Sequence, residues 1–116
     1  MIGLRNTLAI IAFVVVLFIA IASAKANGQT GRPAFVSRFA WAVALCETNG
    51  DFHHDGGSYE GAWGWYVGTW NLDKRAGYPS SPIDATPRQQ NRVFHDSLVR
   101  GRSFGCITHG GYRSHL

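Results

Sequence analysis

The stretch PAFVSRFAWAVALCETNG, which runs from Pro33 to Gly50, has the pattern of a helix that packs against a core. Its apolar side chains recur at the spacing of one helix face, at Phe35, Phe39, Ala42, Val43 and Cys46. Proline suits the first turn of a helix, and Asn49-Gly50 is a suitable stop. The pattern therefore predicts an amphipathic helix from Pro33 to Glu47.

Two further helices are predicted downstream. The stretch Thr86-Pro87-Arg88-Gln89 combines an N-cap, a proline at the first helical position and a glutamine able to reach back to the cap, and Gly101 ends this helix. A shorter helix is expected from Val67 to Arg75. Between the helices, residues 51–58 (DFHHDGGS) are typical of a loop or a short irregular hairpin. We expect a small α+β domain, mostly α, with a loop-rich middle.

The N-terminal segment has the pattern of a secretory signal peptide. Arg5 precedes an apolar run from Leu8 to Ala22, and the small residues Ala22-Ser23-Ala24 form a cleavage pattern. We expect Met1–Ala24 to be removed, and an uncleaved membrane anchor is the alternative. The rest is expected to comprise three parts that lie outside the cytoplasm: a flexible tether (residues 25–34), a domain (residues 35–108) and a loose tail (residues 109–116).

The chain has two cysteines, Cys46 and Cys106, and both lie in the part expected to be exported. Oxidising compartments favour disulfides, and a domain this small commonly needs a covalent link for stability. We therefore expect a disulfide between them, with two separate thiols as the alternative.

Glu47 follows the first cysteine at the carboxyl end of the predicted helix. The unpaired carbonyl groups of a helix end disfavour an anion, and partial burial does the same. Both effects favour the protonated carboxyl group that a general acid requires. A solvated glutamate with no role is the alternative, and the helix pattern alone favours it.

Further motifs follow in a fixed order along the chain. They are Trp41-Ala42-Val43-Ala44-Leu45-Cys46-Glu47-Thr48-Asn49-Gly50, Tyr59 and Gly61, Gly68-Thr69-Trp70, Ala85-Thr86-Pro87-Arg88-Gln89-Gln90, and Cys106. In these motifs and their order, the chain from Phe39 to Cys106 resembles the resuscitation-promoting factors. That family has a W-x-x-x-A-x-C-E-S-G-G opening, a Y-G-G-L-Q-F-x-x-x-T-W centre, an A-T-R-E-Q-Q helix start and a closing cysteine.

The resemblance implies a small lysozyme-like domain with one disulfide, which cuts the MurNAc-GlcNAc glycan of peptidoglycan as a lytic transglycosylase does. It gives Glu47 the role of catalytic acid and base, pairs Cys46 with Cys106, and places Thr69 in the cleft near the glutamate. The protein would be secreted and cell-wall associated, and would act in cell-wall remodelling or growth stimulation. Its implied partners are peptidoglycan glycan strands and other cell-wall hydrolases, and no cofactor is implied.

The implied mechanism needs a single carboxyl group. Glu47 would protonate the departing oxygen and then take a proton from the C6 hydroxyl of the same muramyl sugar, which closes to a 1,6-anhydro ring. Hydrolysis usually needs a second carboxylate, for which Glu60 or Asp51 is the candidate. An exposed loop charge is, however, the favoured interpretation of Glu60.

The central motif departs from the family pattern. Gly61-Ala62-Trp63-Gly64-Trp65 appears with one inserted residue and no glutamine. If that glutamine contacts the substrate, the contact is missing or replaced. A non-catalytic peptidoglycan-binding or signalling module on the same fold is therefore the alternative function.

Aromatic residues provide candidate sugar contacts, because a flat ring complements the apolar face of a sugar. Trp63 and Trp65 flank a glycine and are expected to face a cleft. Tyr66 is a further candidate for stacking, and Tyr59 is a further substrate-binding candidate. Core packing is the favoured role of the other tryptophans, Trp41 and Trp70.

Two features argue against other classes of site. His53-His54-Asp55 lacks the spacing that brings ligands together on zinc, so we expect a solvated loop and no metal site. The net charge of +4 comes without the motif of a nucleic-acid module, so we expect attraction to an anionic cell envelope and no nucleic-acid partner. A membrane would be a partner only if the N-terminal segment stayed uncleaved, as in a structural envelope protein.

Overall fold

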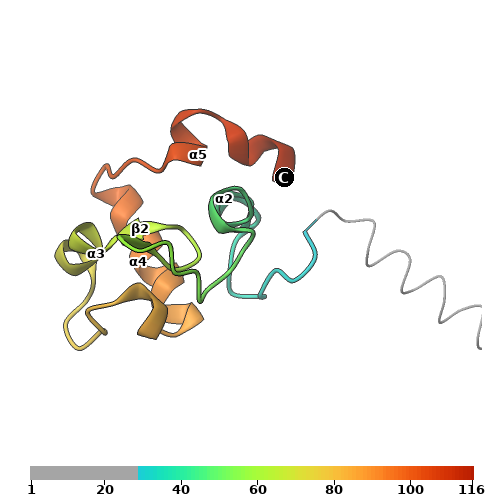
Figure 1. Cartoon of the computed structure of the whole chain (residues 1–116). Helices are drawn as coiled ribbons and strands as arrows, with labels where there is room; N and C mark the ends of the chain where they lie inside the picture. Colours follow the sequence, from blue (N-terminus) through green and yellow to red (C-terminus); the bar gives the residue numbers. More distant parts are fainter. Residues whose placement is uncertain (1–28) are drawn as a thin grey trace, which may run out of the picture. The chain divides into compact units, whose positions relative to one another are not determined.

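The computed structural model describes residues 29–116, and its folded unit comprises Gly31–Leu116 (Figure 1). The expected signal peptide, Met1–Ala24, and the first part of the expected tether, residues 25–28, lie outside the described residues. Within residues 29–116, no helix is long and apolar enough to cross a membrane. The fold combines several helices with one two-stranded sheet, as expected for a small, mostly helical α+β domain.

Helix α2 (Arg38–Thr48) begins later than its apolar pattern predicts. Ser37 is the N-cap, and its hydroxyl accepts a hydrogen bond from the amide of Ala40, which the helix itself leaves unpaired. Pro33 lies instead in the preceding turn, where its carbonyl accepts a hydrogen bond from the amide of Val36. The predicted end of the helix is confirmed, because Asn49 caps it in the left-handed conformation.

A short antiparallel hairpin lies in the aromatic middle of the chain, where the sequence pattern predicts no strand. Strand β1 (Tyr59–Glu60) pairs with strand β2 (Trp65–Tyr66), so that Tyr59 lies opposite Tyr66 and Glu60 opposite Trp65. Helix α3 (Val67–Asp73) follows β2 directly and ends two residues before the predicted Arg75.

Helix α4 (Pro87–Val99) begins as predicted. Thr86 accepts a hydrogen bond from the amide of Gln89, and the Gln89 side chain accepts one in return from the amide of Thr86. A single turn of 3-10 helix, η1 (Pro82–Asp84), precedes α4, and a short helix, α5 (Gly105–Thr108), follows it.

The last element, η2 (Gly111–His115), is a 3-10 helix that packs against α2 (Figure 1). The ring of Tyr112 lies edge-on to the ring of Phe39, with their centroids 5.3 Å apart. The expectation of a loose tail is therefore wrong for these residues, because Tyr112 has an apolar partner on α2.

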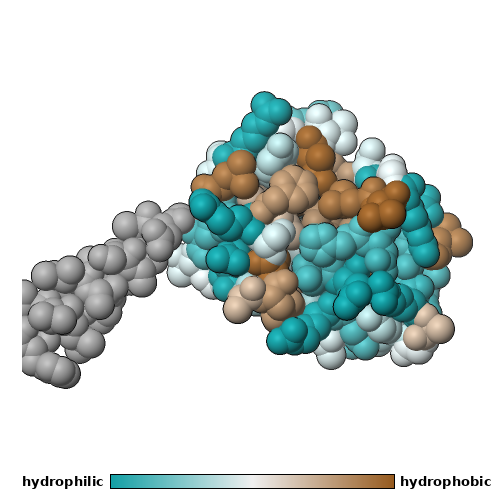
Figure 2. Space-filling model, turned by 180° about the vertical axis from the view of Figure 1, so that it is seen from behind, coloured by the Kyte–Doolittle hydropathy of each residue, from teal (hydrophilic) through white to brown (hydrophobic). Residues whose placement is uncertain are grey.

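All four tryptophans lie in one aromatic core, and each is 4% exposed or less. Trp63 stacks on Phe94 of α4 with centroids 4.8 Å apart, and Trp65 lies edge-on to Trp70 of α3 at 4.9 Å. The predicted core packing of Trp70 is thus confirmed, as is that of Trp41. Figure 2 shows apolar side chains gathered across the upper part of one face, with hydrophilic side chains over much of the rest.

The predicted disulfide is present between Cys46 and Cys106. It joins the last turn of α2 to α5 across a sequence separation of 60 residues. Closing so long a loop removes conformational entropy from the unfolded chain, which stabilises a small domain by about 4 kcal/mol. The bridge therefore fixes α5 beside the residue that follows Cys46, which is Glu47.

Candidate active site

Glu47 lies in the last turn of α2 and lines a cleft of about 200 Å³. The other residues that line this cleft come from the hairpin, from α3 and from the segment before α5. They are Tyr59, Trp63, Gly64, Trp65, Tyr66, Thr69, Arg102, Ser103, Phe104 and Gly105. The cleft thus brings the predicted catalytic glutamate together with the residues predicted to contact the substrate, which are Tyr59, Trp63, Trp65, Tyr66 and Thr69.

One oxygen of the Glu47 carboxyl group is held by the backbone. The amide of Cys106 donates a hydrogen bond of 2.8 Å to Oε1, across 59 residues of sequence. The other oxygen, Oε2, lies 3.9 Å from where a Cβ atom on Gly64 would stand, so it is turned toward the hairpin side of the cleft. The disulfide between Cys46 and Cys106 fixes the residue that donates this hydrogen bond, so the Glu47 carboxyl group has a defined orientation.

The hairpin turn that faces Glu47 is fixed from two sides through Ala62. The Thr48 hydroxyl donates a hydrogen bond of 2.6 Å to the Ala62 carbonyl, which joins the end of α2 to the turn. The Gln90 side chain accepts a hydrogen bond of 3.0 Å from the Ala62 amide, which joins the turn to α4. Both contacts act on a fully buried residue, so they set the distance between the turn and Glu47.

Gln90 connects three loops to α4 and is itself completely buried. Its side-chain nitrogen donates hydrogen bonds to the carbonyls of Phe52, Pro82 and Ala85. Gly61 leaves the room for this amide, because a Cβ atom there would lie 2.9 Å from the Gln90 oxygen. The sequence pattern placed Gln90 at a helix start and contained no signal of this long-range role.

Neither candidate for a second carboxylate lines the cleft. Glu60 is only 9% exposed and accepts a short hydrogen bond from the Ser81 hydroxyl, so the favoured interpretation of an exposed loop charge is wrong. Asp51 is exposed, and its carboxylate accepts a hydrogen bond from the amide of His53. Glu47 is therefore the only acidic residue among those that line the cleft.

The tryptophans expected to stack on a sugar have no open ring face. Trp63 is 0% exposed and Trp65 2% exposed, because Phe94 stacks on Trp63 and Trp70 packs edge-to-face with Trp65. The nitrogen of Trp63 donates a hydrogen bond to the carbonyl of Ala40 on α2, which also places that ring in the core. Both rings support the wall of the cleft from behind rather than presenting a surface to a ligand.

The exposed aromatic surface of the cleft consists of Tyr59 and Tyr66. Their side chains are cross-strand neighbours, with ring centroids 5.9 Å apart, and each is more than half exposed. A Cβ atom on Gly68 would lie 2.7 Å from the Tyr66 ring, so this glycine lets the ring lie close against the start of α3. Thr69, also on α3, lines the same cleft and is partly buried.

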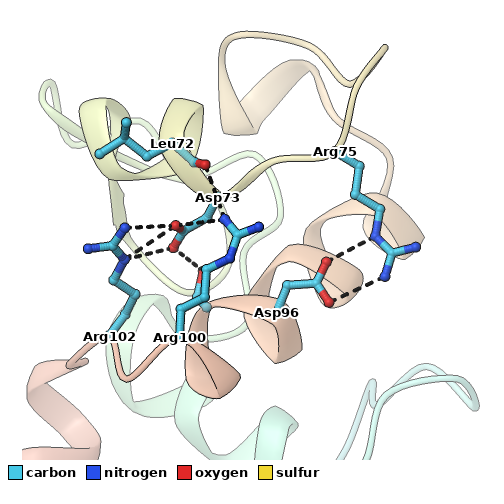
Figure 3. Close-up of polar contacts among 7 residues, drawn as sticks. Leu72, Asp73, Arg75, Asp96, Arg100 and Arg102 are labelled. Atoms are coloured by element: carbon cyan, nitrogen blue, oxygen red, sulfur yellow. Dashed lines mark hydrogen bonds and ion pairs between the residues drawn. The ribbon is translucent and has the colours of Figure 1, made fainter.

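The one basic residue that lines the cleft, Arg102, is held by a buried carboxylate (Figure 3). Asp73, at the end of α3, is 1% exposed and accepts hydrogen bonds from Arg102, Arg100 and Ser97. Burial alone would raise the pKa of Asp73, but the hydrogen bonds from Arg102, Ser97 and Arg100 outweigh it, and the pKa lies below its usual value. The same hydrogen bond, from Arg102 to Asp73, raises the pKa of Arg102.

A second ion pair, Arg75 to Asp96, also appears in Figure 3, with a distance of 2.9 Å. The hydrogen bond from Arg75 lowers the pKa of Asp96. Because the Arg75 side chain is about half exposed, such a pair contributes little to stability. It does not line the cleft, so it belongs to the surface.

Among residues 29–116, no group of three or more His, Cys, Asp or Glu side chains is placed to hold a metal ion. No protein-family model, curated protein or solved structure matches the chain. The geometry of the site therefore carries the functional conclusion.

Proposed function

We propose that the domain cleaves the glycan of bacterial peptidoglycan, with Glu47 as the catalytic acid and base. The observation that carries the proposal is a single carboxyl group, oriented by a backbone amide, in a cleft that also exposes two tyrosines. Glycosidic cleavage requires a carboxylic acid that protonates the departing oxygen, and exposed aromatic rings can pack against the apolar face of a sugar. A lysozyme-like fold, export by the N-terminal segment and a cell-wall location are parts of the same proposal.

The proposed reaction is an intramolecular transfer within the substrate. Glu47 donates its proton to the glycosidic oxygen, the C1–O bond of the muramyl sugar breaks, and the departing sugar leaves with a hydroxyl group. The Glu47 carboxylate then takes the proton of the C6 hydroxyl of the same muramyl residue. The C6 oxygen bonds to C1, which forms a 1,6-anhydro ring and returns Glu47 to its acid form without the use of water.

One feature of the cleft favours this reaction over hydrolysis, and a second suits a residue that loses a proton and regains it. Hydrolytic glycosidases usually place a second carboxylate at the site, whereas Glu60 and Asp51 do not line this cleft. The Cys106 amide can stabilise the carboxylate that forms when Glu47 has lost its proton, since hydrogen bonds to a charged acceptor are the strong ones. One carboxyl group could therefore carry out both proton transfers.

The test compares the purified protein with its Glu47→Gln variant on isolated peptidoglycan. The amide keeps the size of the side chain and an oxygen that can accept the Cys106 hydrogen bond, but it cannot donate the proton. Asp51→Asn is a matched control, because it removes an exposed acid outside the cleft. We expect the release of soluble fragments to fall by at least about 100-fold in Glu47→Gln and to stay unchanged in Asp51→Asn.

Mass analysis of the fragments separates the mechanisms. Anhydro-muramyl ends are expected, and reducing ends throughout would instead indicate hydrolysis with a second carboxylate. If the protein sediments with cell walls but cleaves nothing, the alternative function of a binding or signalling module would replace the proposed enzymatic function. Equal activity of Glu47→Gln and the unmodified protein would exclude Glu47 as the catalytic residue.

A further inference from the structure

Arg102 combines two properties that a purely structural arginine does not need. It lines the cleft beside Ser103 and Phe104, and its side chain remains 40% exposed although it binds a buried carboxylate. Its backbone amide also donates a hydrogen bond to the carbonyl of Ser97, which fixes the main chain at this point. The Arg102 side chain is thus both held by a carboxylate and partly exposed.

The contact with Asp73 uses one edge of the guanidinium group (Figure 3). Nε donates to both carboxylate oxygens at 3.0 and 3.3 Å, and Nη2 donates to one of them at 2.9 Å. A guanidinium group carries five N–H donors in a rigid plane. The donors of Nη1 therefore lie on an edge that Asp73 does not occupy, and that edge can bind a second oxyanion.

The charges around Asp73 do not balance. The Asp73 carboxylate forms ion pairs with two arginines, because Arg100 also lies 3.1 Å from it. The pair of cations therefore leaves one positive charge uncompensated in this cluster. Only Arg102 of the two lines the cleft, where Glu47 is the single acidic residue and Arg102 the single basic one.

We propose that Arg102 binds a carboxylate of the glycan's muramyl substituent, and that Asp73 is the residue that positions it. The inference rests on the proposed function and specifies which part of the glycan the cleft recognises. The carboxylate is either the free lactyl group of a denuded muramyl residue or a carboxylate of the attached peptide. A neutral glycan of N-acetylglucosamine alone offers no such group, so the cleft would distinguish muramyl strands from chitin by charge.

The experiment measures binding by calorimetry in the Glu47→Gln background, where the ligands stay intact. Three ligands of equal glycan length are compared: a denuded muramyl tetrasaccharide, the same saccharide with its peptides, and chitotetraose. We expect Arg102→Ala to weaken binding of one muramyl ligand by about tenfold and to change chitotetraose binding by less than twofold. Arg102→Lys should restore part of the affinity, because it keeps the charge and loses the planar edge.

Arg100→Ala is the matched control, since it also removes a hydrogen bond to Asp73 but lies outside the cleft. It should leave the affinities for all three ligands within twofold. Loss of affinity for denuded saccharide in Arg102→Ala assigns the lactyl carboxylate, and loss for the peptide-bearing saccharide alone assigns the peptide.

Equal losses for neutral and charged ligands, or equal losses in the Arg100 and Arg102 variants, would overturn the role of Arg102. The proposed function would survive that result if the Glu47→Gln protein with both arginines intact still bound the muramyl ligands. Failure of that protein to bind any of the three saccharides would overturn the proposed function itself, and the role of Arg102 with it. Circular dichroism of each variant confirms that the compared proteins are folded.

Discussion

Replacing Gln90 with leucine should destabilise the domain more than any surface change, because Gln90 is completely buried and hydrogen-bonded on all sides. The leucine side chain is similar in size and apolar, so the core stays filled. The substitution leaves the buried Ala62 amide without its acceptor and removes the donor from the carbonyls of Phe52, Pro82 and Ala85.

The magnitude follows from how these groups can be satisfied without Gln90. The Pro82 carbonyl keeps a hydrogen bond from the Ala85 amide, so its loss is small. An unpaired buried amide costs about 1–3 kcal/mol, and the other lost hydrogen bonds cost about 0.5–1.5 kcal/mol each. We expect a total near 3 kcal/mol, which is a large share of the roughly 5–10 kcal/mol stability of a domain this size.

Urea unfolding followed by tryptophan fluorescence measures this effect, because all four tryptophans lie in the core. A loss of 3 kcal/mol should lower the unfolding midpoint by roughly 2 M urea. Gln89→Leu is the matched control: it removes only a capping hydrogen bond at an exposed helix start and should cost about 1 kcal/mol or less. If both leucine variants unfold at the same urea concentration, the assignment of Gln90 as the connection between the loops is wrong.

Three other changes test separate parts of the fold. Replacing both Cys46 and Cys106 with alanine should lower the free energy of unfolding by about 4 kcal/mol, measured by urea titration under non-reducing conditions. Gly68→Ala should shift the Tyr66 ring and weaken glycan binding several-fold, while calorimetry shows a stability change below about 1 kcal/mol. Asp73 has a lowered pKa in the folded protein, so its stabilising contribution is present above the usual pKa near 4 and is lost as the pH falls below that value. Thermal unfolding from pH 6 to pH 2 should therefore show a weaker pH dependence in Asp73→Asn, and an unchanged dependence would contradict this role.

Features encoded by neighbouring residues could be predicted from the sequence. The capping box at Thr86 and the end of α2 at Asn49 each depend on a few consecutive residues, and both are present. The disulfide followed from the number of cysteines and the expected compartment. The start of α2 was placed too early because proline suits both a first helical turn and the turn that precedes a serine cap.

Features that depend on distant residues could not be predicted in this way. Trp63 and Trp65 are buried by contacts with residues of α3 and α4, so a pattern that places them beside a glycine cannot show that they are buried. Arg102 and Asp73 are 29 residues apart, and neither is distinguished by its neighbours. The sequence therefore predicts both the tryptophans and the tyrosines of the hairpin as sugar contacts, whereas only Tyr59 and Tyr66 are exposed.

The position of Glu47 links the disulfide to the proposed chemistry. Its Oε1 atom accepts a hydrogen bond from Cys106, the residue that also closes the bridge to Cys46. A group that gives up a proton and later takes one back must hold the same position in both steps, and the amide donor can provide that constraint. Loss of the bridge should therefore reduce glycan cleavage even at temperatures where the domain remains folded. Full activity in a folded protein without the disulfide would show that the bridge stabilises the fold and does not orient the carboxyl group.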